Sequence, residues 1–284
     1  MNEAPEAWTA TLDAVRAGAI SPAVALARLT LTGTAPDPVL LARLAGENDA
    51  LRRVAELASG RADRLAKLAR LAADGLDPAG EDMNAATAAL FDRLAAEEPE
   101  AAVAFYSLGD PVLLAQATEE LAGVVRTWAR VTGRRVLDLG CGIGRLSFAL
   151  AGEAESVLGL DVSSGMVGRA RAAMDGLANV RFKVASGREL ADVADGGVDL
   201  VVAADCFPYL VRAELLAPMM AEIARVLAPG GDLLVFNWSY RGDPARDATD
   251  ARVLAAANGL QVLRSGERPF TMWDADGFHL RRAG

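Results

Sequence analysis

Residues 136–146 constrain the fold more than any other part of the chain. They read Val-Leu-Asp-Leu-Gly-Cys-Gly-Ile-Gly-Arg-Leu, an apolar run that leads into three glycines at alternate positions. Such a run predicts a buried strand, and glycines permit the positive φ of a tight turn. The helix expected after this turn begins with exposed N–H groups, which favour a negative or electron-rich ligand group. The stretch therefore predicts a strand, a turn and a helix with a ligand against the backbone.

Strand-like and helix-like segments alternate from Gly133 to the end of the chain. The expected strands are 134–139, 156–160, 179–184, 198–204, 231–237, 260–264 and 268–272 or slightly later. Alternation of this kind predicts an α/β fold, with a mostly parallel sheet and helices on both faces. Only Ser265-Gly266-Glu267 separates the last two strands. That connection is too short for a crossover helix, so these strands must form an antiparallel hairpin.

The N-terminal part predicts a different architecture, made of helices alone. Ser21-Pro22, Asp37-Pro38 and Asp110-Pro111 each pair a capping side chain with proline at the first helical position. Leucines with helical spacing follow between 47 and 73, and a further helix is expected within 82–98. We therefore divide the chain into an all-α extension or lid, residues 1–110, and a ligand-binding domain, residues 111–284. The extension would serve as a helical cap or as an oligomerisation surface.

The composition excludes several classes of function. The 284 residues carry a net charge of −9, whereas binding of bulk nucleic acid or anionic membranes needs a basic surface. Two cysteines and one histidine give neither a disulfide framework nor zinc spacing, so we expect no metal. The acidic N-terminus has no leader pattern, and no apolar run approaches the roughly 20 residues of a membrane span. We expect a cytoplasmic protein without nucleic-acid or membrane partners.

Two acidic residues indicate the kind of ligand. Asp161 ends the second expected strand, where a carboxylate can accept hydrogen bonds from two ribose hydroxyls, so the ligand should be a nucleoside derivative. The glycines depart from the dinucleotide pattern G-x-G-x-x-G, because Arg145 stands at its last position. Asp138 at the end of the first strand projects into the crevice above the sheet. A carboxylate there suits an amino group and a sulfonium cation better than two phosphates.

These segments resemble the class I S-adenosylmethionine-dependent methyltransferases. Residues 138–144 are similar to the family's first motif, which holds the methionine end of the cofactor, and Asp161 matches the acidic residue that binds the ribose. Residues 199–205 resemble the fourth strand and its exit, and 225–235 the helix, Leu-x-Pro-Gly-Gly turn and fifth strand. The resemblance covers about residues 130–284. It implies a seven-stranded doubly wound sheet of order 3-2-1-4-5-7-6, S-adenosylmethionine as cofactor, and SN2 transfer of its methyl group.

The resemblance also implies which residues bind the cofactor. They are Asp138, Gly140, Cys141, Gly142, Gly144, Asp161, Val162, Met166, Ser186, Gly187, Arg188 and Asp205. Val162 and Met166 match positions that pack on the adenine. One segment departs from the family, which often has Gly-Asp-Ala after the third strand, with the Asp on the adenine amino group. This chain has Ala185-Ser186-Gly187 there. The Ser186 side chain, or backbone groups of Gly187 and Arg188, would supply that contact instead.

Three residues are candidates for catalysis: Asp205, Tyr209 and Tyr106. Asp205 and Tyr209 follow the fourth strand, and in this family upstream segments such as that of Tyr106 often fold over the cofactor. Helix capping is the alternative role for Asp205. Other residues after the fourth and fifth strands would either face the acceptor or pack in the core: Cys206, Phe207, Asn237, Trp238, Ser239 and Tyr240. His279 is expected at the surface or at a sheet edge, and not as a base.

The leading hypothesis is a methyltransferase for a small-molecule acceptor, whose acceptor atom (oxygen, nitrogen, carbon or sulfur) is open. A general base is needed only where the acceptor must lose a proton. The alternatives are a non-catalytic S-adenosylmethionine-binding regulatory or partner protein and a methyltransferase that acts on a protein. A nicotinamide-dependent oxidoreductase is a further alternative, against which the glycine spacing argues. A homodimer through the N-terminal helices is also open.

Overall fold

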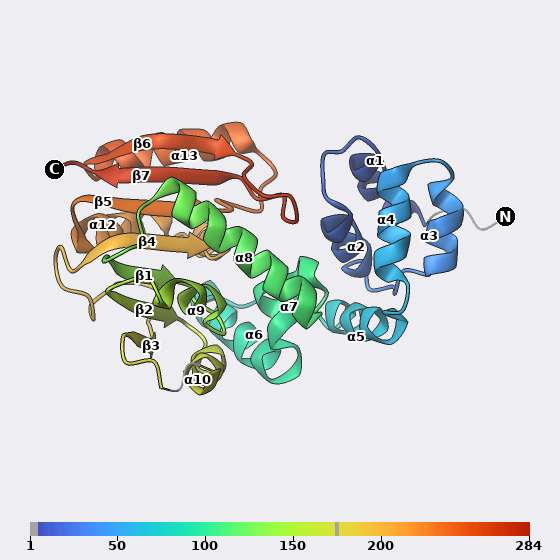
Figure 1. Ribbon diagram of the computed structural model, residues 1–284, viewed down its shortest axis with the longest axis horizontal. Coiled ribbons are helices and arrows are strands. Elements are labelled where there is room, and N and C mark those ends of the chain that lie inside the picture. Colours follow the sequence, from blue (N-terminus) through green and yellow to red (C-terminus); the bar gives the residue numbers. More distant parts are fainter. Residues whose placement is uncertain (1–4, 174–175) are drawn as a thin grey trace. The chain divides into compact units, whose positions relative to one another are not determined.

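The computed structural model describes residues 5–173 and 176–284, which form two compact units. The first unit contains the described residues up to Asp77, together with Glu98–Ala117 and Phe270–Asp274. The second contains Pro78–Glu97, Thr118–Pro269 and Ala275–Gly284. The two units therefore interleave along the chain, and residues 78–97 group with the later part of the sequence (Figure 1).

The first unit consists of helices in its described residues. They are η1 (Glu6–Trp8), α1 (Thr9–Arg16), α2 (Pro22–Thr30), α3 (Pro38–Ala45), α4 (Asp49–Ala58), α5 (Ala62–Ala73), α7 (Pro99–Val103), η2 (Phe105–Ser107) and the beginning of α8 (Pro111–Trp128). The side chains of Ser21, Asp37 and Asp110 accept hydrogen bonds from backbone N–H groups in the first turns of α2, α3 and α8. The three predicted helix starts are therefore confirmed, since each cap satisfies an otherwise unpaired donor.

The second unit is built on a seven-stranded sheet. Its strands are β1 (Arg135–Leu139), β2 (Ser156–Asp161), β3 (Val180–Val184), β4 (Val198–Ala204), β5 (Leu227–Phe236), β6 (Leu260–Glu267) and β7 (Gly277–Arg282). Their spatial order is β3-β2-β1-β4-β5-β7-β6. Strands β1 to β5 pair in parallel, whereas β7 pairs antiparallel with both β5 and β6. The predicted order and the antiparallel last pair are confirmed.

The position predicted for the last strand is wrong. Residues 268–272 form no strand, because β6 continues to Glu267 and β7 begins only at Gly277. Pro269 has no N–H with which to join a ladder. The segment Phe270–Asp274 belongs instead to the first unit, where Trp273 stacks on Tyr106 with ring centroids 5.7 Å apart. Phe270, which lies within the predicted strand, packs on Trp273 with ring centroids 5.2 Å apart, outside the sheet.

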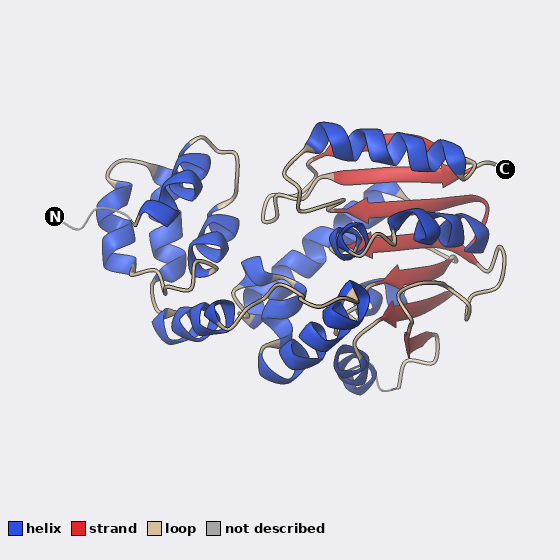
Figure 2. Cartoon of the chain, turned by 180° about the vertical axis from the view of Figure 1, so that it is seen from behind, coloured by secondary structure: helices blue, strands red, loops and turns tan. Residues whose placement is uncertain are grey.

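Helices cover both faces of the sheet, as the doubly wound class requires (Figures 1 and 2). The helices of this unit are the later part of α8, α6 (Met83–Glu97), α9 (Arg145–Ala151), α10 (Ser164–Ala173), α11 (Phe207–Arg212), α12 (Leu216–Val226) and α13 (Pro244–Ala257). Val201, Leu233 and Phe278 of the sheet are fully buried in one core cluster with Met220 and Ile223 of α12. Helix α6 packs on α10 and α11. None of the helices in the described ranges is long and apolar enough to cross a membrane.

Candidate functional site

The turn after β1 lies at the carboxyl edge of the sheet. Gly140, Gly142 and Gly144 have φ values of 75°, 53° and 82°, which confirms the positive φ expected of them. Close packing adds a second requirement. A Cβ on Gly140 would lie 2.5 Å from the Cβ of Cys206, and a Cβ on Gly144 would lie 2.7 Å from the Phe182 ring. Glycine is therefore needed in this turn for its conformation and for the space around it.

Asp161 at the end of β2 is fixed against the same turn. One carboxylate oxygen accepts a hydrogen bond from the N–H of Gly142 at 2.8 Å, and the other accepts from the N–H of Ser163 at 2.9 Å. Burial raises the pKa of Asp161, although these hydrogen bonds oppose that effect. Each oxygen keeps a further lone pair for a ligand. A carboxylate held in this way at the end of the second strand is suited to the two hydroxyls of a ribose.

The Asp138 side chain is buried beneath the turn and does not stand in the open crevice. It is 2% exposed, and one oxygen accepts hydrogen bonds from the N–H and Oγ of Ser147 in α9, at 3.1 and 2.6 Å. Burial raises the pKa of Asp138 to about 6. This carboxyl group therefore ties β1 to α9, and its contact with a ligand stays a prediction.

The loop after β3 lies against the beginning of α6. Nδ2 of Asn84 donates to the carbonyl oxygen of Ser186 at 2.7 Å. Gly187 has a φ of 73°, and a Cβ there would overlap Oδ1 of Asn84 and lie 2.7 Å from Cγ1 of Val162. The structure thus brings Val162, Ser186 and Gly187 together as the resemblance implies. It adds Asn84, which the sequence analysis did not single out.

Helix α6 and the residue just before it, Asp82, make two further contacts that sequence reasoning missed. Asp82 forms an ion pair with Arg188 at 2.8 Å. Asp92 accepts a hydrogen bond from Oγ of Ser163 at 2.7 Å, and the N–H of the same serine donates to Asp161. These residues belong to no motif, and in the helix predicted over 82–98 they read as solvent-facing polar positions. No sequence signal marks them, because their contacts depend on where α6 packs.

A second cluster lies at the ends of β4 and β5. One carboxylate oxygen of Asp205 accepts hydrogen bonds from Nδ2 of Asn237 at 2.6 Å and from the hydroxyl of Tyr240 at 2.9 Å. The Tyr209 ring lies perpendicular to that of Tyr240, and edge-on to Phe91 of α6 with centroids 5.3 Å apart. Desolvation and the charge of Asp205 raise the pKa of Tyr240 well above its ordinary value. Tyr240 is therefore a neutral phenol that donates to the Asp205 carboxylate.

The backbone at Asp205 and Asn237 explains how two strands bring these side chains together. Both residues are left-handed, with φ values of 61° and 69°. Asp and Asn tolerate this region better than most residues. The N–H of Asp205 also donates to the carbonyl oxygen of Phe236 at 2.9 Å. Each strand thus ends in a sharp turn, and the two polar side chains meet between the strand ends.

Four further expected site residues have buried side chains. Cys141, Met166, Phe207 and Trp238 are each at most 5% exposed. Phe207 and Trp238 pack edge to face in the core, with centroids 5.3 Å apart, so the core-packing alternative holds for both. Tyr106 belongs to the first unit, and its catalytic role stays a prediction.

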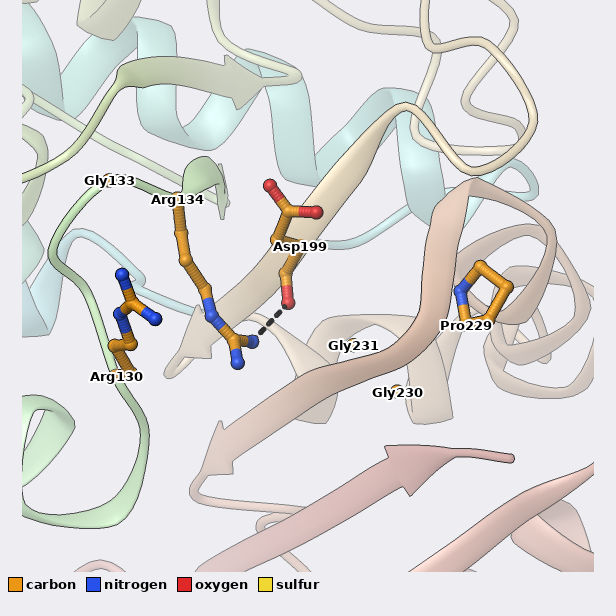
Figure 3. Close-up of a pocket in the computed structure, with 7 residues that line it drawn as sticks. All are labelled: Arg130, Gly133, Arg134, Asp199, Pro229, Gly230 and Gly231. Atoms are coloured by element: carbon orange, nitrogen blue, oxygen red, sulfur yellow. Dashed lines mark hydrogen bonds between the residues drawn. The ribbon is translucent and has the colours of Figure 1, made fainter. Parts of the chain in front are cut away.

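The amino edge of the sheet holds a pocket of about 260 Å³ (Figure 3). It is lined by Arg130, Gly133, Arg134, Asp199, Pro229, Gly230 and Gly231. Arg134 donates to the carbonyl oxygen of Asp199 at 3.0 Å. This pocket lies at the amino ends of β1 and β4, whereas the residues predicted to bind the ligand gather at the carboxyl ends.

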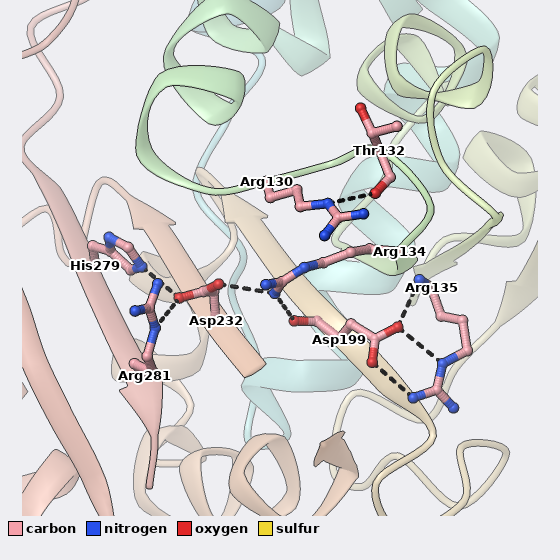
Figure 4. A network of polar contacts seen from close by, with 8 residues as sticks. All are labelled: Arg130, Thr132, Arg134, Arg135, Asp199, Asp232, His279 and Arg281. Atoms are coloured by element: carbon pink, nitrogen blue, oxygen red, sulfur yellow. Dashed lines mark hydrogen bonds and ion pairs between the residues drawn. The ribbon is translucent and has the colours of Figure 1, made fainter. Parts of the chain in front are cut away.

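A buried polar network next to this pocket corrects the expectation for His279 (Figure 4). His279 is 3% exposed, because the strand order puts β7 between β5 and β6. Its Nε2 lies 2.8 Å from a carboxylate oxygen of Asp232, which is fully buried and also pairs with Arg134 and Arg281. His279 is therefore neither at the surface nor at a sheet edge, and it binds β7 to β5.

Sequence comparison places the central part of the chain among known domains. Residues 136–231 match the family model described as a methyltransferase domain. The 2-methyl-6-phytyl-1,4-hydroquinone methyltransferase of Synechocystis sp. is 34% identical over 112 residues, which cover 39% of this chain and 34% of the relative. The ubiquinone biosynthesis O-methyltransferase of Thiobacillus denitrificans is 33% identical over 108 residues, which cover 38% of this chain and 45% of the relative. The chain thus spans less than half the length of these curated relatives.

Structural comparison agrees on the fold. A crystal structure of magnesium protoporphyrin IX methyltransferase from Synechocystis superposes with a TM-score of 0.55 at 19% identity, covering 72% of this chain and 99% of that one. The sheet order and its antiparallel end are those of the class I S-adenosylmethionine-dependent methyltransferase fold. Within that fold, residues 136–231 of this chain are the part that matches the methyltransferase domain model.

Proposed function

We propose that the protein transfers a methyl group from S-adenosylmethionine to a small-molecule acceptor. The carboxylate of Asp161, fixed by the glycine turn, supports a nucleoside as part of the ligand. Asp138 and Asp205 also lie near this turn, and three acidic groups disfavour a pyrophosphate. They suit a ligand whose tail carries an amino group and a sulfonium cation. The residues present therefore fit this cofactor better than a dinucleotide.

The Asp205 cluster is the single observation that carries the proposal of catalysis. It presents a carboxylate at the carboxyl edge, held by Asn237 and Tyr240, with the aromatic rings of Tyr209 and Phe91 nearby. Such rings suit a planar acceptor. One relative is named a 2-methyl-6-phytyl-1,4-hydroquinone methyltransferase, and another is named a ubiquinone biosynthesis O-methyltransferase, which states oxygen as its acceptor atom. We therefore propose an acceptor with a hydroxyl group on an aromatic ring.

The chain's own residues have three roles: they bind the ligands, they orient the acceptor, and one of them accepts a proton. When bound, the cofactor would supply an electrophilic methyl group, with S-adenosylhomocysteine as the leaving product. Asp205 accepts the proton that the acceptor hydroxyl loses. Asn237 and the neutral hydroxyl of Tyr240 hold the Asp205 carboxylate in one orientation. Placing the acceptor in line with the methyl group supplies a large part of the rate enhancement.

Turnover of S-adenosylmethionine with a panel of acceptors tests this proposal. The panel contains a hydroxylated aromatic compound, an amine and a thiol, and the readout is formation of S-adenosylhomocysteine. Asp205→Asn should lower kcat by about 10²- to 10⁴-fold and leave the affinity for S-adenosylhomocysteine unchanged. The matched control is Asp195→Asn, since that carboxylate is 80% exposed and pairs with Arg225. It should change neither quantity.

Each other outcome has a definite meaning. Loss of S-adenosylhomocysteine affinity in Asp205→Asn would make Asp205 a cofactor-binding residue and remove its role as base. Turnover of the amine or the thiol alone would contradict the hydroxyl acceptor. Failure of every acceptor, with S-adenosylhomocysteine still bound, would favour the non-catalytic alternative.

A further inference from the structure

The sheet topology places the base of a bound nucleoside at the end of β3. If Asp161 holds the ribose, the ribose lies at the end of β2 and the tail of the ligand lies at the glycine turn after β1. The base is attached to the other side of the ribose. Since the strand order is β3-β2-β1, the base then lies over the end of β3. This placement rests on the proposed function.

The amide of Asn84 lies at that place in a fixed orientation. Its Nδ2 is 2.7 Å from the carbonyl oxygen of Ser186, and a carbonyl oxygen can only accept a hydrogen bond. The nitrogen must therefore point to Ser186, which turns Oδ1 the other way. Oδ1 and Cγ1 of Val162 both approach the position that a Cβ on Gly187 would take. Oδ1 thus lies beside the Val162 side chain, at the rim of the loop after β3.

The side chains of Ser186 and Arg188 in this loop already have partners. Oγ of Ser186 accepts a hydrogen bond from the N–H of Arg188 at 3.2 Å, and the Arg188 side chain pairs with Asp82. Oδ1 of Asn84, by contrast, accepts no hydrogen bond from the residues that the structure describes. An acceptor at the edge of a base fits an exocyclic amine and repels a carbonyl oxygen.

We propose that Oδ1 of Asn84 accepts a hydrogen bond from the exocyclic amine of the cofactor's adenine and thereby selects adenine over bases that carry a carbonyl oxygen there. Asn84 lies in α6, in the part of the sequence that precedes the methyltransferase domain. The helix therefore contributes a specificity-determining residue, and it supplies the acceptor that the absent acidic residue after β3 does not.

The test compares two ligands that differ at this position of the base and at the neighbouring ring nitrogen N1, which is an acceptor in adenine and carries a hydrogen in hypoxanthine. Dissociation constants are measured by calorimetry for S-adenosylhomocysteine and for S-inosylhomocysteine, in which a carbonyl oxygen replaces the amine. Wild type should prefer the adenosyl ligand by about 10-fold or more. Asn84→Ala should reduce that preference by about 3- to 10-fold, the size of one hydrogen bond. The matched control is Asn258→Ala, since Asn258 also donates to a backbone carbonyl, that of Leu254 at 2.8 Å. It should keep the full preference.

The preference is the ratio of the two dissociation constants measured with one variant. A smaller folded fraction changes both apparent constants equally and leaves this ratio unchanged. An Asn84→Ala protein that binds S-adenosylhomocysteine with an unchanged preference would overturn the inference and leave the proposed function intact. A wild-type protein without any preference would do the same. A wild-type protein that binds neither ligand would overturn the proposed function together with the inference.

Discussion

The buried Asp138 carboxyl makes the stability of the fold depend on pH, and Asp138→Asn should remove that dependence. The pKa of Asp138 in the folded protein is about 6, raised by burial from an ordinary value of 3.8. The folded state therefore holds this proton more tightly than the unfolded state does. The resulting stabilisation is complete below the unfolded pKa and is lost as the pH rises through the folded pKa.

The expected size follows from the two pKa values. A gap of about two pH units corresponds to about 3 kcal/mol, since one unit is about 1.4 kcal/mol. About 0.5 kcal/mol is already lost at pH 4, where part of the unfolded carboxyl is ionised, so about 2 kcal/mol remains between pH 4 and pH 7.5. Asparagine does not titrate, and its oxygen can accept both hydrogen bonds from Ser147. The free energy of unfolding of Asp138→Asn, minus that of wild type, should rise by about 2 kcal/mol over this range.

Urea unfolding at a series of pH values measures this difference. Asp199→Asn is the control, because hydrogen bonds from Arg135 lower the pKa of Asp199. The Asp199 carboxylate stabilises the fold at pH values above its unfolded pKa. The free energy of unfolding of Asp199→Asn, minus that of wild type, should therefore change by less than about 0.5 kcal/mol between pH 4 and pH 7.5. If the free energy of unfolding of Asp138→Asn, minus that of wild type, stays constant from pH 4 to pH 7.5, the assignment of a buried carboxyl with a raised pKa is refuted.

Three further substitutions test the site and the sheet. Asp161→Ala should weaken S-adenosylhomocysteine binding at least about 100-fold, since each hydrogen bond to a charged group contributes about 1.5–3 kcal/mol; unchanged affinity in calorimetry would contradict the role of Asp161. Asp232→Ala leaves buried His279 without its partner and should lower the free energy of unfolding in urea by about 3–5 kcal/mol; a loss below about 1 kcal/mol would contradict a structural role for the network. Gly159→Ala puts a Cβ 2.6 Å from Cε1 of Phe182, in overlap with the ring, and should cost about 1–3 kcal/mol of stability; the clash is not the cause if the added change Phe182→Leu recovers nothing.

Local signals account for what the sequence predicted correctly about the fold. The caps at Ser21, Asp37 and Asp110 act within one helical turn, so their effect does not depend on the rest of the chain. The strand order followed from the resemblance, and the structure confirms it. The last strand was misplaced because Phe270–Asp274 is apolar for a different reason, its packing in the first unit. His279 was misjudged because burial of β7 on both faces depends on the strand order, which a polar residue near the chain end does not reveal.

The candidate site likewise contains residues that could be predicted from the sequence and residues that only the structure shows. The glycine turn and Asp161 could be found from spacing, because a positive φ and a carboxylate at a strand end have sequence signatures. Asn84 could not be found, since a polar residue in the first turn of a helix normally faces solvent. Its contact with Ser186 joins residues 102 positions apart in the chain. Asp205 was identified as a candidate, but Asn237 and Tyr240 became its partners only through the left-handed turns at the strand ends.

Thermal unfolding of the purified protein with S-adenosylmethionine, S-adenosylhomocysteine or NAD tests the central claim most directly. A ligand that binds only the folded state raises the free energy of unfolding by about 2.7 kcal/mol at 100-fold excess over its dissociation constant. We expect a clear rise in Tm with both adenosyl compounds and none with NAD. No rise with either adenosyl compound, or a rise with NAD alone, would contradict the proposal that this chain is an S-adenosylmethionine-dependent methyltransferase.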